Sequence, residues 1–275
     1  MIPDSALLAR LRDSWIHLPD KPEETAECTM AALTAFASSE AQLHQLVEKR
    51  VSGVPLSHLT GRQKFMEIDM LAGPEALIPR KETEILARGA LQILGDLVHD
   101  RGDAQVIDVC CGSGNVALAL ATYEPRAHVL GSDLSPEAVS LATRNAAYLG
   151  LQERCQFTAG DLFAPFHARA DLVTCNPPYI SSGKLEKMPP EIANFEPKLA
   201  FDGGPFGINI LARLIREAPR YLKPNSWLAF EVGLGQGRAM TKMLARSPDY
   251  FAVETLGDAS GEIRAVLART AVARV

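Results

Sequence analysis

The stretch QVIDVCCGSGNVALALATY, residues 105–123, decides the fold class of this 275-residue chain. A short apolar run leads into a glycine turn, and apolar residues at helical spacing follow the turn. The same order returns along the chain, with further strand-like runs at 127–133, 155–161, 170–180 and 226–233. Strands that alternate with helices predict an α/β fold with an open, mainly parallel sheet. The segments 250–258 and 262–269 are expected to close it as a hairpin, which gives seven strands.

The residues before this sheet predict two smaller parts. Apolar residues at helical spacing in residues 1–60 predict a small N-terminal helical domain. Glycine and proline residues interrupt the segment 61–80, which predicts a β-hairpin-like linker. Within it, residues 63–71 (QKFMEIDML) are expected to form a strand. The third part, 81–275, is expected to be the α/β domain itself.

Composition excludes several classes of protein. The net charge of −5 is a poor footprint for a nucleic-acid binder, which usually carries a basic face. The five cysteines form no CxxC pair and the six histidines are scattered, so we expect reduced thiols and no metal site. Early charges speak against a signal peptide, and no apolar run reaches membrane-spanning length. We therefore expect a cytoplasmic protein without a membrane partner.

The glycine turn predicts a cofactor site. Gly112 and Gly114 let the backbone approach a ligand, and Asp133 follows about 20 residues later, where a ribose-binding acid is expected. Ser135 is the better cap of the next helix, which leaves Asp133 free for that role. A nicotinamide cofactor is a weak alternative, because the GxGxxG pattern ends in Asn-Val-Ala here. The acids Asp108, Asp133 and Asp161 at three strand ends suit the diol, amine and cation of S-adenosylmethionine.

The motif Asn176-Pro177-Pro178-Tyr179 is the most specific feature of the sequence. The Asn176 amide and the carbonyls of the proline turn can accept both hydrogens of a planar NH₂ group, and Tyr179 offers a ring face. Methyl transfer from a sulfonium needs alignment and exclusion of water rather than acid–base chemistry. Cys175 is therefore interpreted as a buried strand residue. An ordinary β-turn is the structural alternative for the motif.

With this motif the chain resembles the HemK/PrmC-type protein-glutamine methyltransferases over residues 50–270. Asn-Pro-Pro-Tyr is shared with amino-methyltransferases of DNA and RNA, and the resemblance to the protein-glutamine branch rests on further segments, LIPRKETE at 77–84, NFEP at 194–197, AFDGG at 200–204 with Gly207, FEVG at 230–233 with Gln236, and Asp258 with GEIR at 261–264. The resemblance implies a Rossmann-like class I methyltransferase domain that methylates the Gln of the Gly-Gly-Gln motif in peptide chain release factors. It implies that Glu231 is a structural acid, or that it contacts the site residues without touching the substrate.

The residues expected at the site follow from the motifs and this resemblance. Asn176, Pro177 and Tyr179 are expected to be catalytic. The expected acceptor-binding residues are Asn176, Pro177, Pro178, Tyr179, Ile78 and Arg80. The expected cofactor-binding residues are Asp108, Cys110, Cys111, Gly112, Ser113, Gly114, Asp133, Leu134, Asp161, Leu162 and Asn176.

The sequence departs from the family at three places. Cys110 stands where the first loop glycine is usual, Lys81 replaces a proline, and the N-terminal helical region is shorter by about one helix. That region is thought to grip the protein substrate. A small nitrogen-containing acceptor is therefore an alternative to a release factor, with DNA or RNA amino-methylation and a non-catalytic binding module as further alternatives.

Overall fold

The computed structural model describes residues 5–14 and 24–271, and its centre is a seven-stranded sheet. The strand order is β5-β4-β3-β6-β7-β9-β8, with β9 antiparallel to both of its neighbours and the other pairs parallel. The strands are β3 (Ala104–Val109), β4 (Ala127–Asp133), β5 (Cys155–Ala159), β6 (Ala170–Cys175), β7 (Leu222–Glu231), β8 (Tyr250–Gly257) and β9 (Ile263–Thr270). The expected α/β fold, with a mainly parallel sheet of seven strands, is confirmed.

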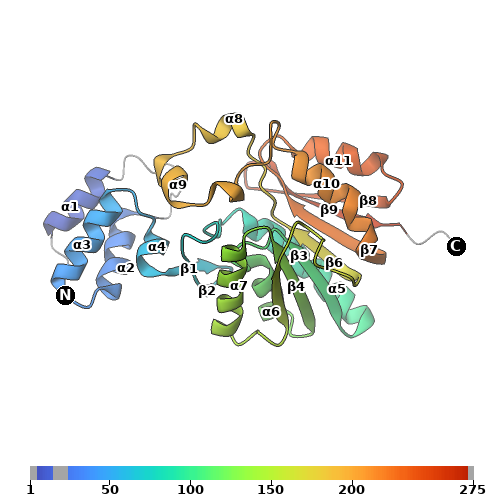
Figure 1. Ribbon diagram of the computed structural model, residues 1–275, viewed down its shortest axis with the longest axis horizontal. Coiled ribbons are helices and arrows are strands. Elements are labelled where there is room, and N and C mark those ends of the chain that lie inside the picture. The colour runs from blue at the N-terminus through green and yellow to red at the C-terminus, as the bar shows by residue number, and fades with distance from the viewer. Residues whose placement is uncertain (1–4, 15–23, 272–275) are drawn as a thin grey trace.

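Helices cover both faces of the sheet (Figure 1). One apolar core lies between the sheet and α5 (Thr83–Arg101), α6 (Asn115–Tyr123) and α7 (Pro136–Tyr148). The other lies beneath α10 (Asn209–Glu217) and α11 (Gly237–Arg246). Every residue of β6 is buried, as expected for a central parallel strand with both faces covered.

The segment 63–71 is a hairpin rather than the single expected strand. β1 (Arg62–Phe65) pairs antiparallel with β2 (Ile68–Leu71). Met66 and Glu67 form the turn, with φ of 48° and 63°. Two residues in the left-handed region match the twist of a two-residue hairpin, a conformation that usually calls for Asn or Gly. Neither stands here, so the residue types at 66 and 67 do not place a turn within the expected strand.

Side chains of the α/β body hold the hairpin in place. The Asn145 side chain accepts from the Leu71 amide at 2.7 Å and donates to the Leu71 and Ser113 carbonyls, both at 3.1 Å. Glu84 accepts from the Met66 amide at 3.1 Å. The hairpin is therefore tied to α7, to α5 and, through Ser113, to the glycine turn.

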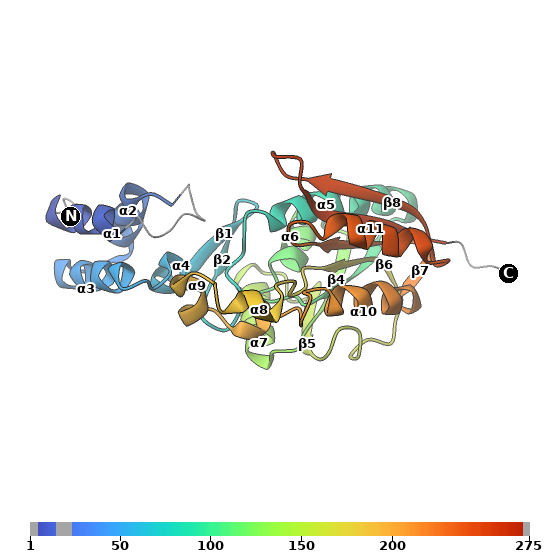
Figure 2. The ribbon, with the colours of Figure 1, turned by 90° about the horizontal axis from the view of Figure 1, so that it is seen from above.

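The N-terminal helices pack around a small core of their own, formed by residues such as Leu11, Leu33 and Val47. They are α1 (Ser5–Ser14), α2 (Ala26–Phe36), α3 (Glu40–Val51) and the short α4 (Leu56–Thr60). Figures 1 and 2 show α1, α2 and α3 at the end of the molecule away from β7 and β8. We keep the division into 1–60, 61–80 and 81–275 as a proposal.

A long connection between β6 and α10 lies between the N-terminal helices and the sheet (Figure 1). It contains α8 (Ser182–Leu185), α9 (Pro190–Phe195) and the single-turn η2 (Lys198–Ala200). Arg50 of α3, almost fully buried, forms ion pairs with Glu24 at 3.1 Å and with Glu191 of α9 at 3.4 Å. The connection is thereby joined to the N-terminal helices.

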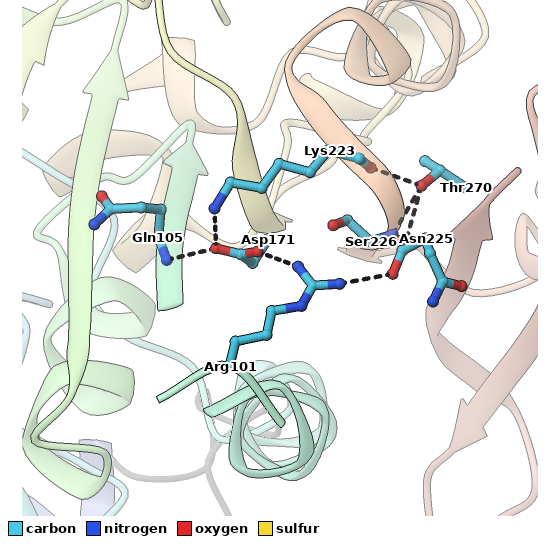
Figure 3. A network of polar contacts seen from close by, with 7 residues as sticks. All are labelled: Arg101, Gln105, Asp171, Lys223, Asn225, Ser226 and Thr270. Carbon is cyan, nitrogen blue, oxygen red and sulfur yellow. Dashed lines mark hydrogen bonds and ion pairs between the residues drawn. The ribbon is translucent and has the colours of Figure 1, made fainter. Parts of the chain in front are cut away.

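A polar network connects residues at the end of the sheet where the central strands β3 and β6 begin (Figure 3). The buried Asp171 carboxylate accepts from the Gln105 amide at 2.9 Å and from Lys223 Nζ at 2.7 Å, and also pairs with Arg101. Next to it, the Thr270 hydroxyl accepts from the Ser226 amide at 2.9 Å. Asp171 thus links β3, β6, β7 and the end of α5.

The described part of the chain lacks two kinds of feature. Within residues 5–14 and 24–271, no helix has both the length and the apolar character needed to cross a membrane. The same residues contain no cluster of side chains suited to holding a metal ion.

Candidate active site

The glycine turn after β3 is a left-handed loop. Cys110, Gly112 and Gly114 have φ of 57°, 55° and 80°. A Cβ added at Gly114 would lie 3.0 Å from the Phe157 ring, whereas one added at Gly112 would meet no protein atom within 4 Å. Gly114 is therefore needed for packing against the sheet. Gly112 leaves space above the backbone, as expected where a ligand approaches.

Asp133, at the end of β4, holds this loop. Its Oδ2 accepts from the Gly112 amide at 2.9 Å, and its Oδ1 accepts from the Ser135 amide at 3.0 Å. Ser135 caps α7, as the sequence predicted, by accepting from the Ala138 amide. Asp133 does not cap α7, and backbone amides bind both of its oxygens. Burial raises the pKa of Asp133, and these amides oppose the rise.

Asp108 lies beneath the loop and is almost fully buried. Burial raises its pKa to about 7, although the Thr174 hydroxyl and the Ala117 amide act in the opposite direction. The Thr174 hydroxyl donates to Asp108 Oδ1 at 2.6 Å. A carboxyl poised near neutrality would become fully charged beside a cationic ligand.

A cavity of about 490 Å³ opens above this loop, at the carboxyl ends of the strands. Such an edge is where open α/β sheets bind ligands. The expected site residues that line the cavity are Asp108, Cys110, Cys111, Gly112, Asp133, Leu134, Asp161, Leu162, Asn176 and Pro178. Ser113 and Gly114 do not line it. Lining residues that were not expected include Glu75, Leu77, Asn115, Glu137, Leu199 and Ile210.

Two of the expected residues lie at the rim of this cavity. Leu134 is 56% exposed, so an apolar side chain is available to cover a flat ligand. The Asp161 side chain is about half exposed, and its carboxylate pairs with Arg213 of α10 at 3.1 Å. Asp161 therefore lines the cavity while it shares its charge with Arg213.

A second cavity, of about 250 Å³, adjoins the first. Leu77, Asn176 and Ala200 line both cavities, while Pro177, Tyr179 and Arg80 line only the second. Pro178 was expected on the acceptor side and lies on the side of the first cavity. Ile78 was expected near the acceptor and lines neither cavity, because its side chain is buried.

Contacts of Glu196, just after α9, explain why Ile78 lies outside both cavities. Its almost fully buried carboxylate accepts from the Ile78 amide at 2.9 Å and forms an ion pair with Arg80. The loop that carries Leu77 and Arg80 is thus fixed to the connection between β6 and α10. The sequence pattern NFEP contained this residue without showing which partner it has.

The Asn176 amide is oriented at the boundary between the two cavities. Its Nδ2 donates to the Thr83 hydroxyl at 3.1 Å. Because that donor is engaged, Oδ1 remains to accept from a group in the cavities. An acceptor-only face of this kind can hold a nitrogen that carries hydrogens.

Tyr179 is held from two sides. Its hydroxyl donates to Glu231 Oε1 at 2.8 Å, and its carbonyl accepts from Gln236 Nε2 at 2.9 Å. Burial and the neighbouring Glu231 charge raise the pKa of Tyr179 far above its usual value, so the phenol stays neutral. The ring lines the second cavity, where it can cover a flat group.

Cys175 is fully buried at the end of β6, as the sequence predicted. Burial and the nearby Cys110 thiol raise the pKa of Cys175 well above its usual value. The thiol therefore stays protonated and is no nucleophile.

The two cavities favour transfer of a group from a bound ligand to a nitrogen held at Asn176.

Comparisons with known proteins agree with this geometry. A family model described as a methyltransferase domain matches residues 100–248. The release factor glutamine methyltransferase of Moorella thermoacetica is 38% identical over 226 residues, which are 82% of this chain and 78% of that protein. The protein of the same name from Geobacter sulfurreducens is 36% identical over 230 residues, with 83% and 73% covered.

Solved structures share the fold. A methyltransferase from Pyrococcus furiosus matches with a TM-score of 0.53 and 14% identity, over 76% of this chain and 91% of that one. A T. thermophilus 16S rRNA methyltransferase, solved in complex with AdoMet and guanosine, matches with a TM-score of 0.51 and 17% identity, over 76% of this chain and 49% of that one.

Proposed function

Because the chain belongs to the release factor glutamine methyltransferase family, we propose that it methylates the side-chain amide nitrogen of the Gln in the Gly-Gly-Gln motif of a peptide chain release factor. It is an S-adenosylmethionine-dependent N-methyltransferase. The observation that carries the proposal is the position of Asn176, which lines both cavities while its amide nitrogen donates to Thr83.

The first cavity suits S-adenosylmethionine. The open side of Gly112 leaves room for the ligand, Asp108 supplies negative charge beside a sulfonium or ammonium group, and Asp133 can accept from the ribose hydroxyls. Exposed Leu134 offers an apolar surface for the adenine ring. We propose that these residues bind the cofactor together with Cys110, Cys111, Asp161, Leu162 and Asn176. When bound, the cofactor supplies an electrophilic methyl group.

The second cavity then holds the acceptor. Asn176 Oδ1 and the Pro177 carbonyl accept the two amide hydrogens, which fixes the nitrogen and increases its electron density. The neutral ring of Tyr179 covers the amide plane and stabilises the positive charge that develops on the nitrogen. After the transfer, the methylated nitrogen loses one of its two hydrogens as a proton to solvent. The walls formed by Leu77 and Ala200 exclude water from the junction. Alignment and exclusion of water are the main demands of this reaction.

A small nitrogen-containing acceptor is the second candidate. It rests on the lining of the two cavities, because no described residue before Glu75 lines either of them and the N-terminal helices therefore add no wall for a protein substrate. A release factor substrate would place the reaction in the cytoplasm, where translation ends.

The test combines the enzyme, methyl-labelled S-adenosylmethionine and a release factor. The expected result is one methyl group on the motif Gln, located by mass spectrometry, and none on a factor with that Gln changed to Ala. Asn176→Ala should bind cofactor yet transfer at least about 100-fold more slowly, because it lacks the oxygen that holds the acceptor. Cofactor binding without any labelled factor would contradict the proposal and move the search to small amides and amines.

A further inference from the structure

The two most exposed large apolar side chains among the described residues lie in two loops. Phe206, in the loop before α10, is 79% exposed, and Leu234, in the loop after β7, is 65% exposed. Neither of them lines the first or the second cavity. Single exposed apolar side chains are common on protein surfaces, whereas apolar side chains gathered at one place mark a site of interaction.

Gln236 joins these two loops to each other. Its Oε1 accepts from the Gly233 amide at 2.9 Å, and its Nε2 donates to the Gly207 carbonyl at 3.1 Å. Gly233 directly precedes Leu234, and Gly207 directly follows Phe206. One amide side chain therefore holds together the two loop segments that carry the exposed apolar residues.

The same loops pack against the Asn-Pro-Pro-Tyr motif. Gln236 Nε2 also donates to the Tyr179 carbonyl at 2.9 Å. A Cβ added at Gly207 would lie 2.3 Å from the Tyr179 carbonyl oxygen, and one added at Gly233 would lie 2.9 Å from the Tyr179 ring. Because only glycine permits this close approach, both loops have a fixed position beside Tyr179.

Both loops also lie at the edge of the sheet where the cavities open. β7 runs parallel to β6, so the chain leaves both strands at the same edge. Leu234 follows β7 there as Tyr179 follows β6. Three residues before Phe206, the Gly203 amide donates to the Ile180 carbonyl at 2.8 Å, and Ile180 lines the second cavity. Phe206 and Leu234 therefore belong to the surroundings of the second cavity without being part of its wall.

We propose that Phe206 and Leu234 form an apolar docking patch for a folded protein, whose own apolar residues contact the patch while its glutamine enters the second cavity. The inference rests on the proposed function, since it concerns the same acceptor. A cavity of about 250 Å³ accommodates a side chain, and an acceptor that fills only this cavity would not reach the patch. The patch therefore fits a protein acceptor, and it supplies a contact surface at the edge of the sheet where no N-terminal helix lines a cavity.

The first measurement compares two acceptors, a folded release factor and a short peptide that contains its Gly-Gly-Gln motif. In the double variant Phe206→Ser, Leu234→Ser, KM for the folded factor should rise about 10-fold or more, because the apolar contact with the factor is lost. KM for the peptide, kcat with both acceptors and the dissociation constant of S-adenosylmethionine should stay unchanged. The melting temperature should also stay unchanged, because both side chains are mainly exposed. Phe206→Leu, which keeps an apolar side chain, should retain most of the affinity for the factor.

Phe251→Ser is the matched control, since Phe251 on β8 is 57% exposed and lines neither cavity. An unchanged KM for the folded factor in the double variant would overturn the inference alone. An equal rise of KM for the peptide, or for the folded factor in Phe251→Ser, would also overturn it. Wild-type enzyme that methylates neither acceptor would instead overturn the proposed function, and the inference with it.

A second copy of this chain is the rival occupant of the patch. Sedimentation velocity of the wild type and of the double variant, over a range of concentrations, distinguishes the two occupants. A wild-type enzyme that stays monomeric supports docking of a different protein. A wild-type dimer that the double variant cannot form would overturn the inference, because the patch would then be an interface between two copies.

Discussion

Gly112 and Gly114 lie two residues apart, yet they should respond differently to the same substitution. Gly114→Ala places a Cβ at 3.0 to 3.1 Å from Phe157, Ala142 and Leu118 in a left-handed backbone, so we expect it to destabilise the fold by about 2 kcal/mol or more. Gly112→Ala meets only backbone strain of about 1 kcal/mol, and its methyl group faces the cofactor cavity. Thermal unfolding and calorimetry with S-adenosylmethionine measure the two effects.

The expected contrast is a lower melting temperature for Gly114→Ala and mainly weaker cofactor binding for Gly112→Ala. Equal losses of stability in both variants, with equal cofactor affinity, would show that the loop is not divided in this way.

At this scale, the sequence predicted residues whose role depends on a local motif. Asp133 and Asn176 belong to segments with recognisable spacing, and both line the first cavity. Thr83 could not be found in this way, because it lies 93 residues from Asn176 along the chain and meets it only in the fold. Ile78 was expected beside the acceptor because its loop lies near the site. The sequence does not show which way a side chain in that loop points, and the Ile78 side chain is buried instead.

At the scale of elements, Glu196 in the connection between β6 and α10 should fix the loop that lines the second cavity. Glu196→Ala leaves the Ile78 amide and the Arg80 guanidinium without their carboxylate, which we expect to cost about 3 kcal/mol of stability. The loop carrying Leu77 and Arg80 would loosen, so KM for the release factor should rise about tenfold, or about 1.4 kcal/mol. Glu196→Gln, which can still accept from the Ile78 amide, is the milder control. An unchanged KM in a folded Glu196→Ala enzyme would contradict this role.

The network at the opposite edge predicts a pH dependence of stability. Burial tends to raise the pKa of Asp171, but Lys223, the Gln105 amide and Arg101 outweigh it, so the pKa lies below the usual 3.8. A carboxyl with a lowered folded-state pKa stabilises the fold above its unfolded-state pKa and loses this contribution as the pH falls through the folded-state value. Asp171→Asn should therefore cost about 2 kcal/mol at pH 7.

Urea unfolding of both proteins between pH 7 and pH 3 measures this difference. It should stay constant down to about pH 5 and shrink below the usual carboxyl pKa. A difference that grows on acidification would contradict the assignment. Activity at pH 7 should remain, because Asp171 lies at the edge of the sheet away from both cavities.

Elements were predictable where periodicity and punctuation agreed, as for β3, β4 and β6. The β1–β2 turn was not, because Met66 and Glu67 adopt φ values that their residue types rarely choose. Contacts from Asn145 and Glu84, distant in sequence, hold that turn in place.

At the scale of the whole molecule, the buried Arg50–Glu191 ion pair joins the N-terminal helices to α9, so we expect it to affect binding of the acceptor. Arg50→Met leaves the buried Glu191 carboxylate without this partner, and we expect a loss of about 3 kcal/mol in stability together with a higher KM for the release factor. The cofactor dissociation constant should not change, because no described residue before Glu75 lines that cavity.

The double variant Arg50→Met, Glu191→Gln should recover part of the stability, because it removes the buried Glu191 charge together with its Arg50 partner. Differential scanning calorimetry and steady-state kinetics with both substrates test this. A weakened cofactor affinity with normal KM for the factor would reverse the proposed direction of the coupling.

The fixed amide of Asn176 also limits how far the reaction can go. In the proposed arrangement, its oxygen and the Pro177 carbonyl accept two hydrogens from the same nitrogen, and a primary amide has both. Once one hydrogen is replaced by methyl, the product can satisfy only one of the two oxygens, and its new methyl group would stand against the other. The enzyme should therefore stop after a single turnover per glutamine, releasing a secondary amide that it no longer recognises as a substrate.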